Sequence, residues 1–266
     1  MARVIAVVNQ KGGVGKTTTS VNLSASLSAT KQKVLLIDLD PQGNATMGSG
    51  INKNKLDKTM NDLLLGDASF ADICQATDWG YDVLPSNGDL TVAEVRLVGG
   101  GKSILQLKTL LEKPSNDYDF ILIDCPPSLN ALTVNALVSA NSVLVPIQCE
   151  YYALEGLTSL LSTIDHVRQT ANSTLCLEGL LRTMYDGRNR LTLEVSEQLQ
   201  EHFSDKLYDT VIPRNVRLAE APSHGIPILC YDKTCQGSAA YLALAGEILR
   251  RKQDMKIKKV KPSVTA

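Results

Sequence analysis

Short apolar runs rich in valine and isoleucine recur along the chain and alternate with segments whose apolar residues have helical spacing. Runs that are apolar at nearly every position are typical of strands buried on both faces of a parallel sheet. The predicted strands are residues 3–8, 33–38, 81–84, 119–124, 142–147, 175–183 and 207–212. The predicted helices are residues 16–29, 130–139, 154–168, 191–203 and 238–252. This alternation predicts a doubly wound α/β fold, with a mostly parallel sheet and helices on both faces.

One stretch interrupts this alternation. Residues 48–80 hold short helical fragments around Asp62 and Phe70 and no clear strand, so we interpret them as a surface insertion. The chain has 266 residues, of which 44% are hydrophobic, and this is enough for one large core. No shift in composition marks a second domain, so we predict a single domain over residues 1–249 and a tail over residues 250–266.

The cysteines and the apolar runs indicate a cytoplasmic protein. Six cysteines are scattered along the chain without a C-x-x-C pair, a usage typical of reduced residues. No uninterrupted apolar stretch of the sequence approaches the ~20 residues that a membrane helix needs.

Charge is unevenly distributed along the chain. The whole sequence carries 27 basic and 28 acidic residues, which argues against a protein that covers nucleic acid with its entire surface. Seven of the basic residues, beginning with Arg250 and Arg251, and one of the acidic residues lie in the tail. The tail therefore has a net charge of +6 and the rest of the chain −7. Any contact with nucleic acid must be local.

A glycine-rich segment joins the first predicted strand to the first predicted helix. It consists of Lys11, Gly12, Gly13, Val14, Gly15, Lys16, Thr17 and Thr18. Backbone N–H groups in such a turn converge on phosphate oxygens, and glycines let the chain approach them closely. Lys16 is expected to neutralise the β and γ phosphates of a nucleoside triphosphate, and the Thr17 hydroxyl to bind Mg²⁺. The pattern departs from the common phosphate-loop motif, since Gln10 replaces its first glycine and Lys11 adds a lysine.

Three aspartates lie at or just after the ends of predicted strands. Asp38 and Asp124 each end an apolar run, and Asp40 follows Asp38 by two residues. Because the carboxyl ends of parallel strands form the ligand-binding edge of such a sheet, we expect all three near the phosphate loop. Asp124 is a candidate to hold Mg²⁺ through water, and Asp38 or Asp40 to orient the attacking water or the Mg²⁺ shell.

These segments together resemble the deviant Walker A partitioning ATPases, the ParA/Soj group of the MinD/ParA superfamily. The resemblance extends from Arg3 to about Leu249. Besides K-G-G-V-G-K-T-T it rests on residues 38–46 (DLDPQGNAT), 124–127 (DCPP), 146–156 (PIQCEYYALEG) and 211–222 (VIPRNVRLAEAP).

The resemblance implies a P-loop ATPase that uses ATP and Mg²⁺ and forms an ATP-sandwiched homodimer. Lys11 would be the signature lysine that reaches the phosphates of the partner chain, as an arginine finger supplied in trans does. Asp40 would position the hydrolytic water, and Pro213 and Asn215 would lie against the adenine. The candidate metal-binding residues are Thr17, Asp38 and Asp124.

The resemblance also implies the partners of the protein. Arg188 and Arg217 match positions linked in the family to non-specific DNA binding, and a ParB-type centromere-binding protein would stimulate hydrolysis. The expected function is chromosome or plasmid segregation by a cytoplasmic, nucleoid-associated protein. The alternative is a MinD-like ATPase that positions the division site by cycling on and off the membrane.

The basic tail has three open interpretations. Arg250 and Arg251 would extend a DNA-binding strip, or the tail is a solvated end, or it attaches to a membrane. Its apolar residues include Met255, Ile257 and Val260 but no aromatic side chain, so no stable membrane association is expected.

Overall fold

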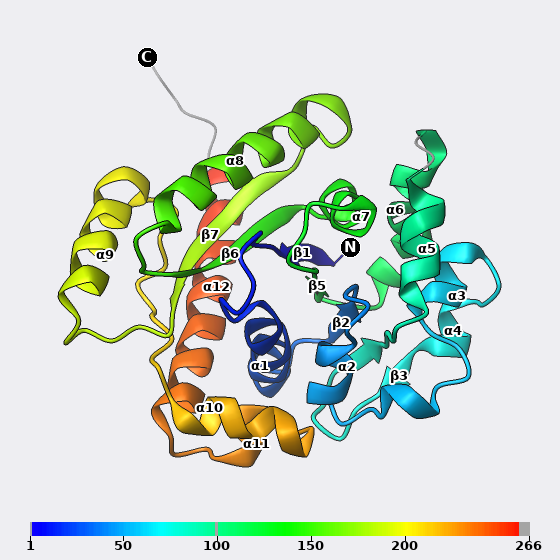
Figure 1. Cartoon of the computed structure of the whole chain (residues 1–266), viewed down its shortest axis with the longest axis horizontal. Coiled ribbons are helices and arrows are strands. Elements are labelled where there is room, and N and C mark those ends of the chain that lie inside the picture. The colour runs from blue at the N-terminus through cyan, green and yellow to red at the C-terminus, as the bar shows by residue number, and fades with distance from the viewer. Residues whose placement is uncertain (1, 99–100, 261–266) are drawn as a thin grey trace.

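A single seven-stranded sheet organises the chain in the computed structural model, which describes residues 2–98 and 101–260 (Figure 1). The strands are β1 (Arg3–Val7), β2 (Val34–Asp38), β3 (Gln75–Ala76), β4 (Asp82–Leu84), β5 (Phe120–Asp124), β6 (Ser142–Gln148) and β7 (Cys176–Thr183). Their order is β3-β4-β2-β5-β1-β6-β7, and every pair is parallel except β3 with β4. The predicted fold class is confirmed.

Helices cover both faces of this sheet. The α-helices are α1 (Lys16–Ala29), α2 (Asn44–Gly48), α3 (Met60–Leu65), α4 (Phe70–Ile73), α5 (Leu90–Leu97), α6 (Gln106–Leu111), α7 (Ala131–Ser139), α8 (Ala153–Thr170), α9 (Arg190–Phe203), α10 (Val216–Glu220), α11 (Ile228–Tyr231) and α12 (Gln236–Val260). Short 3-10 helices are η1 (Lys53–Lys55), η2 (Gly101–Leu105), η3 (Pro114–Asn116) and η4 (Ala221–His224). Figure 1 shows α1 and α12 on one side of the sheet and α7 and α8 on the other.

The core consists of two apolar layers, one on each face. Ile5 and Val7 of β1 pack in the layer beneath α1 and α12, whereas Val4 and Ala6 pack in the layer beneath α7 and α8. Because successive side chains of a strand point to opposite faces, a strand covered on both sides must be apolar throughout. This explains why the central strands are continuous apolar runs.

The predicted strand at residues 207–212 is wrong. This segment lies beside β7, but only Leu207 forms a bridge with that strand. Side chains contact the next residues of the segment: the guanidinium of Arg182 donates to the Tyr208 carbonyl at 2.9 Å, and the Glu247 carboxylate accepts the Asp209 N–H at 3.0 Å. Side chains therefore take backbone groups of residues 208–210, while the N–H groups of Tyr208 and Ile212 still donate to carbonyls of β7.

The segment at residues 48–80 is more than a surface insertion. The two predicted helical fragments are present as α3 and α4, but the segment also contributes β3, the edge strand of the sheet. Met60, Leu63 and Ile73 are buried in the same apolar layer as α7 and α8. The segment therefore closes one end of the core.

The predicted domain boundary after residue 249 falls inside α12, which continues to Val260. Arg251 is part of the packed structure. Its guanidinium donates to the Leu207 carbonyl at 2.6 Å and to the buried Glu247 at 2.7 Å, and lies 4.3 Å from the Tyr208 ring centroid.

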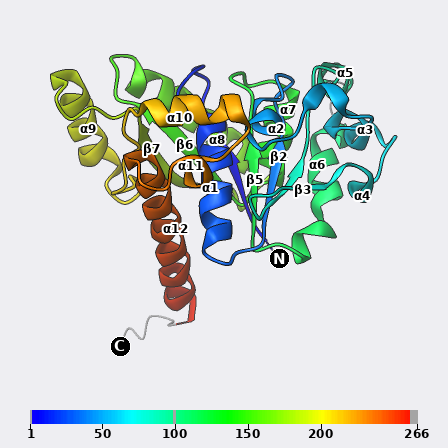
Figure 2. The same cartoon turned by 90° about the horizontal axis from the view of Figure 1, so that it is seen from below.

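The C-terminal half of α12 lies at the end of the sheet opposite the phosphate loop. The Lys252 ammonium lies 4.2 Å from the ring centroid of Phe120, the first residue of β5, whereas Asp124 is its last. Figure 2 accordingly shows α12 running away from α10. Residues 261–266 of the predicted tail lie outside the described residues. Within the described part of the chain, no helix has the length and apolarity required to cross a bilayer.

Candidate functional site

The phosphate loop leads from β1 into the N-terminus of α1. Gly13 and Gly15 have φ values of 75° and 87°, a left-handed conformation that is strained for other residues. Gly15 is the N-cap of α1, and no side chain caps the N–H groups of the first turn. Those N–H groups and the positive end of the helix dipole are therefore available to an anion.

Lys16 is buried at the start of α1, with 7% of its surface exposed. Its ammonium donates to the Lys11 carbonyl at 3.2 Å. Burial lowers the pKa of Lys16, and the charges of Asp124, Cys125 and Asp40 partly offset this effect. A phosphate group would supply the negative charge that this desolvated ammonium needs.

Asp124 is fully buried and connects the sheet to the phosphate loop. Its two carboxylate oxygens accept hydrogen bonds from the hydroxyls of Thr17 and Ser20, each at 2.8 Å. Asp38 is its register partner on β2. Burial, and then the charge of Asp38, raises the pKa of Asp124 to about 8, against the effect of the two hydroxyls. Burial likewise raises the pKa of Asp38 to about 6.

Asp38 and Asp40 hold the segment that follows β2. Asp38 accepts hydrogen bonds from the Thr46 N–H and hydroxyl, each at 2.7 Å, and so fixes the first turn of α2. The Asp40 side chain accepts the Gln42 N–H at 2.9 Å, and its carbonyl accepts the Ser86 hydroxyl at 2.9 Å. Asp40 therefore stands with a defined orientation at the carboxyl edge of the sheet.

The donor set beside the phosphate loop fits Mg²⁺. Thr17, Asp38 and Asp124 offer hydroxyl and carboxylate oxygens, the ligand type that this cation prefers. The negative charge of Asp38 helps to raise the pKa of Asp124 on the adjacent strand, and a divalent cation would relieve that repulsion. The three predicted metal-binding residues are thus close together.

A cavity of about 380 Å³ extends from the phosphate loop toward α10. Gly15 and Thr18 line one side of it, and Pro213 and Asn215 line another. The Asn215 side chain caps α10 by accepting the Leu218 N–H at 3.2 Å. Pro213 and Asn215 therefore lie beside the phosphate loop, as expected for residues that contact the base of a nucleotide.

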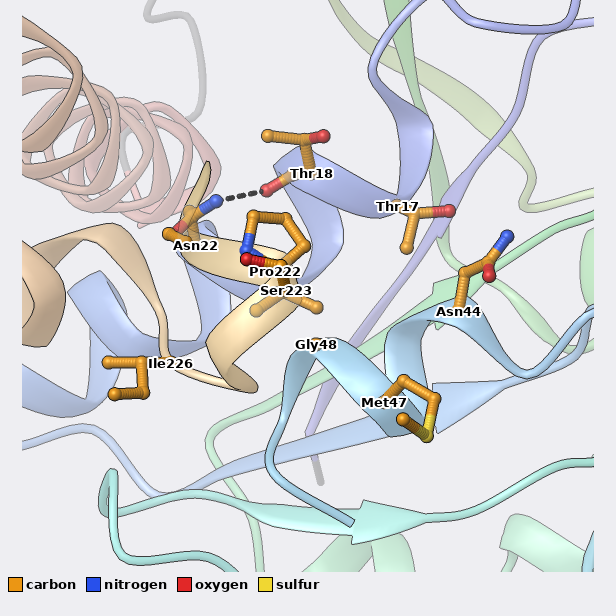
Figure 3. A pocket seen from close by; sticks show the side chains of 11 residues that line it. Thr17, Thr18, Asn22, Asn44, Met47, Gly48, Pro222, Ser223 and Ile226 are labelled. Carbon is orange, nitrogen blue, oxygen red and sulfur yellow. Dashed lines mark hydrogen bonds between the residues drawn. The ribbon is translucent and has the colours of Figure 1, made fainter. Parts of the chain in front are cut away.

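A second cavity of about 380 Å³ lies between α1, α2 and η4 (Figure 3). Thr17 and Asn44 lie at one end of it and Ile226 lies at the other. Pro222, on η4, lines both cavities. The segment that carries α10 and η4 therefore lies beside the phosphate loop at both cavities.

Lys11 lies on the rim of the site, away from the buried charges. Its side chain is 47% exposed and forms an ion pair with Glu150, which is 49% exposed. The predicted signature lysine is therefore on the surface, where a second chain can reach it.

Two of the predicted DNA-binding arginines lie at the same edge of the molecule. Arg188 follows β7 and pairs with Asp186 at 2.8 Å, with 91% of its side chain exposed. Arg217, on α10, pairs with Glu220 at 2.8 Å and is half exposed. A bridge between Tyr185 and Pro213 connects the two segments.

The arginines of α12 do not join this pair. Arg250 is exposed, and Arg251 is held by Leu207 and Glu247. Both lie in the C-terminal half of α12, and Figure 2 shows that this helix runs away from α10. The structure does not bring the four arginines together.

Four polar residues of this region were missed from the sequence: Ser20, Thr46, Ser86 and Glu150. Signals existed for three of them. Ser20 follows Lys16 by one helical turn, Thr46 lies within the DLDPQGNAT segment, and Ser86 follows a predicted strand. No local pattern points from Glu150 to Lys11, since 139 positions separate them.

Comparisons with known proteins identify relatives that match nearly the whole chain. A family profile described as an AAA domain matches residues 2–177. The chain is 49% identical to the chromosome partitioning protein ParA of Caulobacter vibrioides over 259 residues, 96% of this chain and 97% of that protein. It is 51% identical to the sporulation initiation inhibitor protein Soj of Bacillus subtilis over 249 residues, 93% and 98% of the two chains.

A solved structure has a similar fold. Cobyrinic acid a,c-diamide synthase from Mycobacterium smegmatis, solved with bound ADP and magnesium, matches with a TM-score of 0.83 and 38% identity. The match covers 95% of this chain and 96% of that one.

A doubly wound sheet with a phosphate loop after its first strand defines the class of P-loop proteins. Within that class, the chain belongs to the ParA/Soj family of partitioning ATPases. The resemblance found in the sequence is confirmed.

Proposed function

We propose that this chain is an ATPase that segregates DNA by switching between two states. With ATP and Mg²⁺ it forms a homodimer that sandwiches the nucleotide, and this dimer binds DNA without sequence preference. Hydrolysis returns it to single chains that release the DNA. The observation that carries the proposal is a phosphate loop with two different lysines, the buried Lys16 beside Asp124 and the exposed Lys11 on the rim.

The buried residues bind the triphosphate and prepare it for hydrolysis. Lys16 and the N–H groups of α1 hold the phosphates, and Thr17, Asp38 and Asp124 hold Mg²⁺. The cation would neutralise charge that develops on the phosphates. Asp40, fixed by its hydrogen bond to the Gln42 N–H, orients the water that attacks the γ phosphate.

Pro213 and Asn215 place the adenine in the cavity that continues from the phosphate loop. The Mycobacterium smegmatis relative, which has this fold, was solved with ADP and magnesium bound. That pairing supports ATP with Mg²⁺ as the ligand here.

The rim residues connect the nucleotide to partners. Lys11 completes the phosphate site of a second chain, because its side chain is exposed while Lys16 already serves its own loop. Arg188 and Arg217 contact DNA phosphates, since they lie on one edge with the phosphate loop. Membership of the ParA/Soj family supports a ParB-type protein as the activator of hydrolysis.

The proposal is tested with Asp40→Asn, which keeps an oxygen for the Gln42 N–H. Removing the carboxylate should lower ATP turnover by about 100-fold, because a positioned acid–base group contributes on the order of 10²–10⁴ in rate. Gel filtration with ATP should then show a stable dimer. Asp57→Asn, an exposed acid between η1 and α3, is the control and should behave as wild type. Unchanged turnover in Asp40→Asn, or a monomer at micromolar protein with ATP, would refute the proposal.

A further inference from the structure

The ion pair between Lys11 and Glu150 joins the phosphate loop to the segment between β6 and α8. Each side chain is about half exposed, 47% for Lys11 and 49% for Glu150. Tyr151 and Tyr152 directly follow the carboxylate and are 76% and 70% exposed. The surface around the ion pair is therefore open to an approaching macromolecule.

The backbone around Lys11 is fixed, so its side chain is the exchangeable part. The Asn9 amide donates to the Pro146 carbonyl at 2.8 Å, and its oxygen accepts the Lys11 N–H at 3.0 Å. Gln10 donates to Ser159 on α8 at 3.4 Å. These contacts tie the rim of the loop to the same segment that carries Glu150. Release of the ammonium requires only a change of rotamer.

The two lysines of the loop are also in contact with each other, through the backbone of Lys11. Its carbonyl accepts the Lys16 ammonium at 3.2 Å, while its own ammonium is held by Glu150. Without phosphate, each ammonium is therefore satisfied by an oxygen of this chain. Phosphate would draw Lys16 away from that carbonyl. The Lys11 side chain is held separately, by its ion pair with Glu150.

Electrostatics favours exchange of this ion pair when a second chain arrives. Ion pairs between half-exposed side chains contribute little to stability because water and salt screen them. A lysine that meets phosphate oxygens in a closed interface makes a stronger, charge-assisted contact. The Glu150 carboxylate, in contrast, repels phosphates that approach the same rim.

We propose that Glu150 is a positioning residue that holds Lys11 in the single chain and yields it to the nucleotide phosphates of a second copy of this chain. This inference rests on the ATP-sandwiched homodimer proposed above. Glu150 acts through Lys11 and sets the threshold for dimer formation, so that premature pairing of chains is disfavoured.

Two variants test this role by their dimer dissociation constant in a non-hydrolysable ATP analogue with Mg²⁺, measured by analytical ultracentrifugation. Glu150→Gln should tighten the dimer about threefold to tenfold, because it frees Lys11 and removes the repelling charge. Glu155→Gln, an exposed acid in the first turn of α8, is the matched control and should change the constant less than about twofold. Affinity for the analogue in dilute single chains should be unchanged in both.

A zero-length carbodiimide crosslink reports the ion pair directly in the wild-type chain. Mass spectrometry should find Lys11 joined to Glu150 in the nucleotide-free chain and a several-fold lower yield with the analogue. A dimer that forms while this yield stays constant, or a Glu150→Gln dimer no tighter than the control, would overturn the role of Glu150 alone. Absence of any dimer with the analogue would overturn both the proposed function and this inference.

Discussion

The centre and the rim of the nucleotide edge hold their charges in opposite ways. At the centre, Lys16, Asp38 and Asp124 are buried, and several hydrogen bonds fix the carboxylates. On the rim, Lys11 and Arg188 are exposed, and ion pairs hold their side chains. Buried charges are expensive to leave unpaired, whereas exposed pairs exchange partners at little cost. The buried charges of the centre are therefore suited to bind one ligand tightly, and the exposed charges of the rim are suited to exchange one partner for another.

The largest expected effect separates the two lysines of the phosphate loop. Lys16→Ala should weaken ATP binding by at least about 100-fold, since it removes a desolvated cation from the phosphates. Lys11→Ala should leave binding of ATP to the single chain within about threefold, because its ion pair with Glu150 is exposed. It should instead abolish the dimer, because the phosphates that Lys11 is proposed to contact are bound to the other chain. Titration with a fluorescent ATP analogue, followed by gel filtration, measures both. Equal loss of binding in the two variants would contradict the division between centre and rim.

The next effect concerns the buried carboxylates at the centre. Because the pKa of Asp124 is raised to about 8, its contribution to stability is present below pH 4 and is lost as the pH rises through about 8. Asp124→Asn should therefore stabilise the nucleotide-free chain at pH 9, by on the order of 1 kcal/mol or more. The gain should shrink toward pH 5.

Thermal unfolding without Mg²⁺ at pH 5 to 9 measures this gain. A shift of about 2–4 °C corresponds to 1 kcal/mol for a chain of this size. Asp119→Asn, at the exposed residue just before β5, is the control for loss of one carboxylate. A difference between Asp124→Asn and wild type that stays constant with pH would show that burial of the charge is not its cause.

A smaller effect distinguishes Arg251 from the rim arginines. Arg251→Gln should destabilise the fold by about 1–2 kcal/mol, because it removes the hydrogen bonds to Leu207 and Glu247 and the contact with Tyr208. Arg250→Gln, one position earlier and exposed, is the matched control. Chemical denaturation compares the two. Equal free energies of unfolding for the two variants would show that the contacts of Arg251 do not stabilise the fold.

The smallest effect on the fold is expected for the rim arginines. Arg188→Gln and Arg217→Gln should leave the unfolding midpoint unchanged, because their ion pairs are exposed. Each should lower DNA affinity with ATP and reduce the slope of log K against log salt by about 1. Fluorescence anisotropy with labelled DNA over a salt series measures the slope. An unchanged slope would remove that arginine from the DNA interface.

Sequence patterns predicted the centre better than the rim, for a physical reason. The helix at residues 16–29 and the strand ends at Asp38 and Asp124 follow from local apolar runs, because burial on both faces selects such runs. The strand expected at residues 207–212 is absent because distant side chains, those of Arg182 and Glu247, take its backbone groups.

The rim depends on contacts between residues far apart in the sequence. Glu150 and Lys11 are 139 positions apart, and no periodicity connects them. The charge of the tail was visible, but its place at the far end of the sheet follows only from the packing of α12 against Phe120. A count of charges along the sequence therefore could not show that Arg251 is packed into the fold whereas Arg217 is half exposed.

Co-sedimentation with DNA in ATP, in ADP and without nucleotide, over a salt series, tests the account most directly. If the exposed charges of the rim act only when two chains combine, the protein should bind DNA in ATP and bind it weakly in ADP or without nucleotide. The binding in ATP should fall steeply as the salt concentration rises. Equal binding in all three states would contradict control of the rim by the nucleotide at the centre.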